Sequence, residues 1–282
     1  TPEGETEVRL GWSPAAGEDI TTLRLESSTE SDGPWTTETT LTHDAVSTET
    51  TLSSDAPVWF RITSASEELQ GGSSEPIRVW PISATQYDER EVTVDRVPFP
   101  TTLYGVVRYP TSLDGGPFPL VLLLHGNHGN CRPSPDSVED SCATSRDHEC
   151  PWEGWTTTPN AEGMLFQAET LAAQGYIAVS ISGNAMNCRE DYILERAELL
   201  IEHLRYWRSW NENESGPLGS QFLGALDLSR IGLVGHSRGG DAVSHVPTLL
   251  QANPEPGITV ESVFSIAPTD FHDAEVRDTH YA

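Results

Sequence analysis

The sequence lacks lysine altogether, and its acidic residues far outnumber its basic ones. All 16 basic residues are arginine, against 43 Asp and Glu, and the formal net charge is −27. Nucleic-acid binding through a basic surface is disfavoured, because the phosphates would be repelled. Binding to anionic membrane surfaces is disfavoured for the same reason. No apolar run approaches the ~18 residues of a membrane-spanning helix, so we expect no membrane span.

The acidic charge is spread over the whole chain rather than gathered in a tail. One interpretation is a halophilic surface that stays soluble at high salt, where screening removes the repulsion between like charges. The other interpretation is an ordinary acidic secreted protein. Charge bears on solubility rather than on the fold, so the sequence leaves both interpretations open.

Four cysteines lie in the second part of the chain: Cys131, Cys142, Cys150 and Cys188. A zinc site is one alternative, with His125, His128 and His148 nearby, but the cysteine spacings lack the tight pair of structural zinc sites. We therefore predict two disulfides, in any of the three possible pairings, and neither a metal nor another cofactor. Disulfides imply an oxidising compartment, so we expect a secreted or otherwise extracytoplasmic protein.

Residues 1–82 predict a small all-β sandwich. Short stretches rich in Thr, Val, Ile and Trp alternate with turns such as Gly71–Ser74, and helical periodicity is absent. Val58–Ala65, followed by a polar turn and Ser74–Pro76, resembles the last two strands of a fibronectin type III domain. The resemblance implies an immunoglobulin-like module that acts as a spacer or binds a polymer.

Residues 83–95 predict a linker, and residues 96–282 predict a second domain. Four apolar runs are typical of strands buried on both faces: Leu120–Leu124, Tyr176–Ile181, Ile231–Val234 and Val263–Ile266. The spacing of apolar residues predicts helices over Met164–Ala173 and Asp191–Trp210. This alternation predicts an α/β fold, with a mostly parallel sheet that helices cover on both faces.

The strongest motif is Gly235-His236-Ser237-Arg238-Gly239, which follows an expected strand and precedes an expected helix. In that setting a G-x-S-x-G sequence is typical of a nucleophile elbow, a turn so tight that side chains at Gly235 and Gly239 would collide with their neighbours. The turn pushes Ser237 to its tip with the hydroxyl exposed. We therefore predict that Ser237 is a nucleophile, with His236 in a structural role.

A second motif, Leu124-His125-Gly126-Asn127-His128-Gly129, follows the expected strand Leu120–Leu124. A glycine-containing turn at the end of a central strand can direct a backbone N–H toward a developing oxyanion. We assign the two oxyanion donors to the N–H groups of Asn127 and Arg238, with His128 as the alternative to Asn127. His125 precedes the turn, and we expect it to hold the loop.

Together these motifs resemble the α/β-hydrolase superfamily, in particular esterases of the cutinase and platelet-activating-factor acetylhydrolase branch. The resemblance covers residues 95–275 and includes Ser180–Asn184. It implies a mostly parallel α/β-hydrolase sheet, and an exported serine hydrolase that cleaves small or polymeric carboxylic esters through an acyl-enzyme.

The acid and base of a catalytic triad are harder to place. Only 45 residues follow Ser237 in the 282-residue chain, whereas the family delivers the acid and then the histidine on later strands. Asp270 is the candidate acid and His280 the candidate base, with Asp273 and His272 close by. The alternative, which we favour, is that the hydrolase domain is C-terminally incomplete and that both groups lie beyond it.

Two other functions use the same features. A hydrolase-like scaffold could bind a polymer or a partner without turning it over, and a peptidase could use the same serine. The intact elbow and oxyanion loop favour an enzyme, because a binding scaffold has no need for a strained and exposed serine.

Overall fold

The computed structural model describes residues 6–13, 20–52, 55–66, 70–143, 149–189, 191–214, 216–276 and 279–282. The chain divides into two compact units, with the main boundary between Ser83 and Ala84. Two short segments, Pro110–Ser112 and Ala173–Gly175, belong to the first unit although they come later in the chain.

The first unit is built of antiparallel strands. Its strands are β1 (Thr6–Gly11), β2 (Thr22–Ser28), β3 (Thr36–Thr42), β4 (Ser47–Leu52), β5 (Val58–Ala65), β6 (Gln70–Ser73) and β7 (Ile77–Val79). Strands β1 and β4 form one sheet, and the order β3-β2-β5-β6 forms the other, in which β7 also pairs with β5. Every recorded pairing among these strands is antiparallel, as short strands joined by turns allow.

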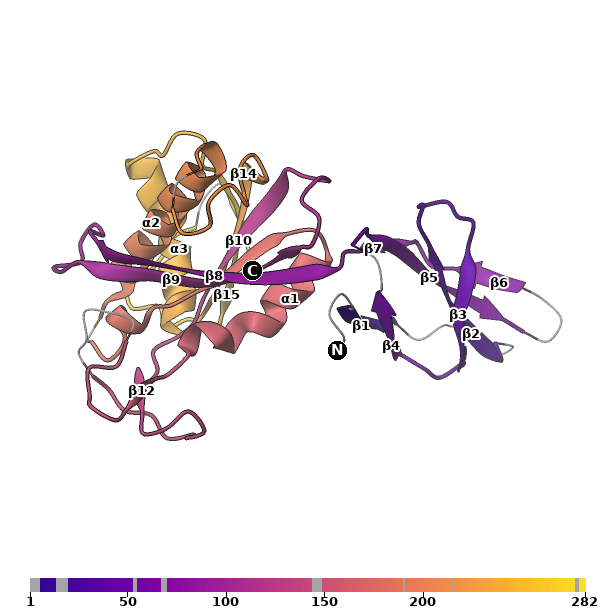
Figure 1. Ribbon diagram of the computed structural model, residues 1–282, viewed down its shortest axis with the longest axis horizontal. Coiled ribbons are helices and arrows are strands. Elements are labelled where there is room, and N and C mark those ends of the chain that lie inside the picture. The colour runs from indigo at the N-terminus through magenta and orange to yellow at the C-terminus, as the bar shows by residue number, and fades with distance from the viewer. Residues whose placement is uncertain are drawn as a thin grey trace. The chain divides into compact units, whose positions relative to one another are not determined.

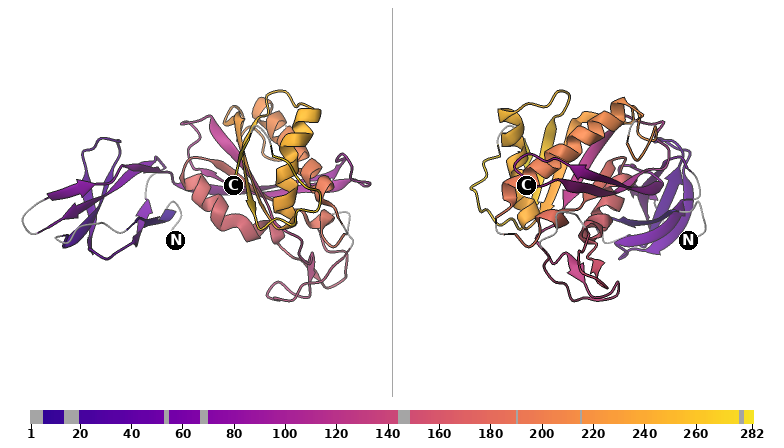
Figure 2. Two further views of the ribbon diagram at one scale, coloured as in Figure 1. Left: turned by 180° about the vertical axis from the view of Figure 1, so that it is seen from behind. Right: turned by 60° about the vertical axis from the view of Figure 1, so that its left-hand side comes forward.

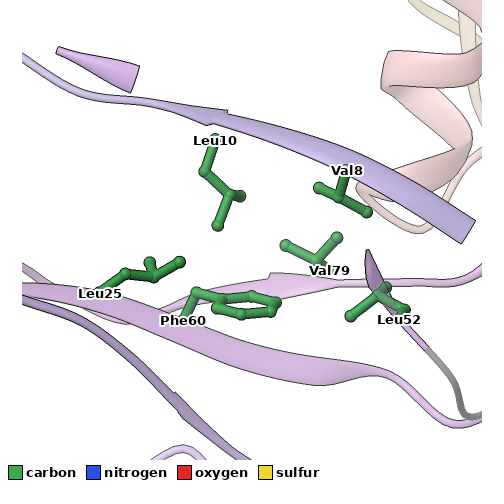
Figure 3. Packing of buried hydrophobic residues seen from close by; sticks show 6 residues of the cluster. All are labelled: Val8, Leu10, Leu25, Leu52, Phe60 and Val79. Atoms are coloured by element: carbon green, nitrogen blue, oxygen red, sulfur yellow. The ribbon is translucent and has the colours of Figure 1, made fainter. Parts of the chain in front are cut away.

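A small apolar core closes this unit. Val8 and Leu10 lie two residues apart on β1 and therefore point to the same face. Figure 3 shows them directed toward Leu25 and Phe60, with Val79 and Leu52 completing the cluster. All six side chains are buried, so the two sheets pack through these residues.

The second unit contains a seven-stranded sheet in the order β16-β15-β14-β10-β13-β9-β8. Its strands are β8 (Ile82–Val92), β9 (Thr101–Pro110), β10 (Phe118–Leu124), β13 (Ile177–Ile181), β14 (Leu226–His236), β15 (Val260–Ile266) and β16 (His280–Tyr281). Strand β10 lies at the centre with its last five residues buried. The segment that we predicted to be a linker contains most of β8.

Helices and short elements complete the second unit. The α-helices are α1 (Leu165–Ala173), α2 (Ile193–Glu212) and α3 (Arg238–Ala252), with 3₁₀ turns η1 (Asn160–Met164) and η2 (Asn184–Met186) and a two-stranded sheet of β11 (Cys131–Arg132) and β12 (Thr156–Thr157). Helices α2 and α3 lie side by side, and α3 packs on β14 and β15 (Figures 1 and 2). Within the described ranges, none of these helices is long and apolar enough to cross a bilayer.

The predicted fold class is wrong. The chain is mostly β, with 38% strand and 20% helix, rather than a mostly parallel α/β sheet covered by helices on both faces. Seven of the eleven strand pairings with a recorded register are antiparallel. The described residues form only three α-helices, and β9 runs antiparallel to β13, which makes the large sheet mixed.

A buried polar contact joins β8 to α2. The hydroxyl of Tyr87 lies 2.6 Å from Nδ1 of His203 and accepts a 3.4 Å hydrogen bond from Nε1–H of Trp207. His203 is fully buried, and burial lowers its pKa to about 3. The imidazole is therefore neutral in the folded protein at neutral pH.

We predict that His203 makes the second unit less stable at mildly acidic pH. The pKa of His203 is about 3 in the folded protein, whereas the ordinary value of a histidine, which applies to the unfolded chain, is 6.5. Between pH 3 and pH 6.5, His203 therefore binds a proton more readily in the unfolded chain than in the folded protein. Stability is full above pH 6.5 and falls as the pH drops toward 3. At pH 5 the expected loss is about 2 kcal/mol. Urea unfolding at pH 7 and pH 5 measures the unfolding free energy at each pH. The loss of this free energy between the two pH values should be about 2 kcal/mol smaller in His203→Asn than in the wild type.

The matched control is His43→Asn, because His43 is exposed. This variant should lose as much stability between the two pH values as the wild type. An unchanged pH dependence in His203→Asn would contradict the assignment.

Candidate active site

The turn between β14 and α3 holds Ser237 in a strained conformation. Ser237 has φ 53° and ψ −123°, a region that residues with a side chain rarely adopt. Strand β14 ends at His236 and α3 begins at Arg238, so Ser237 is the single residue between them. Its N–H donates a 2.9 Å hydrogen bond to the carbonyl of Ile266 at the end of β15. The side chain is half-buried at the carboxyl edge of the sheet.

Two glycines make this turn possible. A methyl group added to Gly235 would lie 2.2 Å from the carbonyl oxygen of Gly239. A methyl group added to Gly239 would lie 2.4 Å from the carbonyl oxygen of Leu124. Backbone atoms cannot withdraw from such contacts without moving a strand or a helix. The spacing of the two glycines therefore has a steric cause in this structure.

The loop after β10 lies against the same serine. A methyl group added to Gly126 would lie 2.9 Å from Cβ of Ser237. The next residue, Asn127, is fixed by its side chain, since Oδ1 accepts a 3.0 Å hydrogen bond from the N–H of Cys188. Within the described part of the chain, the N–H groups of Asn127 and Arg238 donate to no other group. Neither N–H group is therefore committed to an acceptor among the described residues.

His125 braces this loop from within. Its Nε2 accepts a 2.8 Å hydrogen bond from the N–H of Gly183, so its Nδ1 carries the proton and donates to the carbonyl of Gly126 at 2.7 Å. Burial lowers the pKa of His125 to about 3, and the charge of Arg196 acts in the same direction. Because both ring nitrogens are occupied, His125 positions the loop and has no free nitrogen for proton transfer.

A cavity of about 440 Å³ opens beside the elbow. Its lining includes His125, His128, Asn160, Met164, His236 and Ile266. The rings of His128 and His236 are stacked, with centroids 6.3 Å apart and planes inclined by 9°. His236 therefore faces the cavity, although the sequence suggested only a structural role. Burial, followed by the charge of His236, lowers the pKa of His128, which keeps this imidazole in its neutral form at neutral pH.

Two disulfides are formed, which confirms that part of the prediction. Cys131 bonds to Cys150, and Cys142 bonds to Cys188. The second bond fixes the residue whose N–H holds Asn127. Among the described residues, no group of three His, Cys, Asp or Glu could hold a metal ion. His148, named above in the zinc alternative, lies outside the described residues.

The candidate acid and base are not joined to Ser237 among the described residues. Asp270 is exposed, in the loop after β15, with a φ of 54°. His280 is exposed and pairs with Ser262, and Gly232 is the residue opposite Ser262 on β14. Gly232 precedes Ser237 by five residues along β14. The register therefore places His280 well back from the end of the sheet where Ser237 lies.

Two carboxylates that the sequence did not single out organise this region. Buried Asp241, in the first turn of α3, accepts hydrogen bonds through Oδ2 from Oγ1 of Thr269 at 2.9 Å and from the N–H of Phe271 at 2.8 Å. Asp191 lies 2.7 Å from Nε2 of His272. An acid in the first turn of a helix is a common pattern, so Asp241 carried a weak signal. The pairing of Asp191 with His272 spans 81 positions and carried none.

Comparisons of the sequence with protein-family models and with curated proteins find no match.

We predict that Gly126→Ala impairs Ser237 more than it impairs the fold. The added methyl group would press on Cβ of Ser237, so the rate of labelling by a fluorophosphonate probe should fall at least ~10-fold. The expected loss in unfolding free energy is about 1–3 kcal/mol. The control is Gly72→Ala, where a methyl group would meet nothing within 4 Å. Labelling of Gly126→Ala at the wild-type rate would contradict the proposed contact.

Proposed function

We propose that this protein is an exported serine hydrolase that cleaves carboxylic esters through an acyl-enzyme on Ser237. The observation that carries the proposal is the backbone of Ser237, strained at φ 53° between a buried strand and a helix. A strained residue persists only where the surroundings force it, and such residues gather at functional sites. Around Ser237, the turn is packed so closely that a side chain at Gly126, Gly235 or Gly239 would collide with neighbouring atoms.

The backbone around Ser237 supplies the stabilisation that acyl transfer requires. The N–H groups of Asn127 and Arg238 are the proposed oxyanion donors. The N-terminus of α3 adds a partial positive charge, since Arg238 is the first residue of that helix. Donors fixed in this way are typically worth ~2.7–4 kcal/mol of transition-state stabilisation each. The side-chain hydrogen bond that Asn127 accepts from Cys188 holds the first donor in place.

In the proposed reaction, Oγ of Ser237 attacks the ester carbonyl carbon and loses its proton to a general base. The C–O bond to the alcohol then breaks, the alcohol leaves with a proton, and the acyl group stays on Oγ. Water hydrolyses this acyl-enzyme and releases the carboxylic acid. Of the imidazoles lining the cavity, that of His125 has both nitrogens occupied, whereas the ring nitrogens of His128 and His236 form no hydrogen bond to a described residue. Mutation of His128 and of His236 tests which of the two imidazoles acts as the general base.

The two disulfides indicate an oxidising environment outside the cytoplasm. Beyond an oxidising environment, we propose that the protein is secreted. The acidic surface, with its net charge of −27, supports this proposal because it keeps the protein soluble. The role of the first unit as a spacer or a polymer-binding module belongs to the same proposal.

We predict that a fluorophosphonate probe labels Ser237 and that Ser237→Ala abolishes both the labelling and the hydrolysis of short p-nitrophenyl esters. Loss of the nucleophile in a triad hydrolase costs ~10⁶ in kcat, so the residual rate should equal the background. Mass spectrometry of the labelled peptide identifies the modified residue.

Ser134→Ala is the matched control, because Ser134 is exposed in the loop between β11 and β12. It should be labelled like the wild type. Labelling at another serine would reject Ser237 as the nucleophile, and the absence of both labelling and turnover would favour the non-catalytic alternative. Cleavage of amides in place of esters would favour a peptidase.

A further inference from the structure

Apart from Arg189, whose Nε donates to the carbonyl of Ala185, the described arginines of the second unit fall into two groups. Six form ion pairs with carboxylates: Arg90, Arg96, Arg108, Arg205, Arg208 and Arg230. Arg132, Arg196 and Arg238 form none within the described ranges of the chain. Because acids outnumber arginines 43 to 16, an arginine without a carboxylate is unexpected on composition alone. All three belong to the region around Ser237.

Two of these arginines are used internally. Arg196 is fully buried and donates through Nη2 to Oδ1 of Asn187 at 2.6 Å, which fixes the turn after β13. Arg238 donates through Nη1 to the carbonyl of Arg189 at 2.8 Å, and its guanidinium lies 5.5 Å from the ring centroid of Phe271. Arg132 differs from both, because its guanidinium has no hydrogen bond to a described residue.

The backbone of Arg132 is anchored at the wall of the cavity. It ends the short strand β11, where it pairs with Thr156 of β12. The preceding residue, Cys131, is fixed by its disulfide to Cys150. Arg132 lines the same cavity as His236, which precedes Ser237, and Ile266, whose carbonyl accepts the hydrogen bond from the N–H of Ser237. Its Nε is buried without a hydrogen-bond partner, an arrangement that a native protein normally satisfies with a ligand or water.

We propose that Arg132 binds a carboxylate on the substrate, so that the preferred esters carry a free carboxylate, as the half-esters of dicarboxylic acids do. This inference rests on the proposed esterase function. The guanidinium presents N–H groups in a plane that matches the two oxygens of a carboxylate, and the charge-assisted pair would satisfy the buried Nε. The cavity of about 440 Å³ has room for a small acyl chain, and its lining includes Arg132 and His236, the residue that precedes Ser237.

One acidic residue, Asp140, also lines the cavity, and it does not occupy the guanidinium of Arg132 that we propose binds the substrate carboxylate. Asp140 is exposed, and its Oδ2 accepts a 3.1 Å hydrogen bond from the N–H of Gly129. It forms no ion pair with Arg132 in the described structure, although both line the cavity. Arg132 and Asp140 therefore share the cavity without a direct ion pair in the described structure.

The test compares two p-nitrophenyl esters of equal chain length: the neutral pentanoate and the half-ester of glutaric acid, which bears a carboxylate. We expect wild-type kcat/KM to favour the glutarate half-ester. Arg132→Gln should reduce the ratio of the two kcat/KM values ~10–100-fold, the range of a lost hydrogen bond to a charged group. Arg132→Lys should retain part of the preference, since it keeps the charge without the planar fork.

Arg230→Gln is the matched control. It removes the same charge from an arginine that is already paired with Asp227, and it should leave the ratio unchanged. A wild-type preference for the neutral ester, or an equal loss on both esters in Arg132→Gln, would overturn the inference while the esterase function stands.

A binding measurement separates the inference from catalysis. Calorimetric titration of Ser237→Ala with the glutarate half-ester should show binding that is ~10–100-fold weaker in the double variant with Arg132→Gln. If neither ester is hydrolysed by the wild type, the proposed function fails, and this titration still decides the role of Arg132. Equal binding by the two variants would overturn the carboxylate site.

Discussion

The site depends on how closely three backbone segments approach one another at the carboxyl edge of the sheet. The end of β10, the turn from β14 into α3 and the end of β15 meet with no room for a single extra carbon. A methyl group on Gly239 would lie 2.4 Å from the carbonyl oxygen of Leu124, and one on Gly240 would lie 2.8 Å from Oγ of Ser265. The same approach lets the N–H of Ser237 reach the carbonyl of Ile266. The strained serine follows from this packing, because the turn has no other way to pass between its neighbours.

The loops around this contact have little regular structure, so side-chain amides satisfy their backbone groups. Asn130 is buried, accepts from the N–H of Ala143 and donates to its carbonyl. Asn160 donates to Oδ1 of Asn184 at 2.7 Å, and Asn184 donates in turn to the carbonyl of Thr158 at 2.9 Å. Together with the two disulfides, these bonds give the irregular loops fixed positions. Asn127 and Arg132 are therefore presented by an ordered wall, which a binding site requires.

Local sequence patterns predicted the parts of this structure whose cause is local. The apolar run Leu120–Leu124 is a buried strand, and the glycines around Ser237 mark a turn that only glycine permits. The fold class was not predictable in the same way, because the direction of β9 relative to β13 depends on contacts across some 70 residues of sequence. The cysteines predicted disulfides but not their pairing, which tertiary proximity decides. The link between Asp241 and the loop after β15 had a weak signal at best, and the pair of Asp191 and His272 had none.

The electrostatics of the site run against those of the whole protein. A net charge of −27 would repel an anionic substrate at long range, yet at physiological ionic strength the Debye length is only ~8 Å. Inside the cavity, an anion therefore responds to the nearest charges, of which Arg132 attracts it and the exposed Asp140 repels it. Higher salt would weaken the repulsion from the distant acids more than the attraction of a partly buried arginine. An acidic surface and an anion-binding cavity are thus compatible in one molecule, and most compatible in a saline medium.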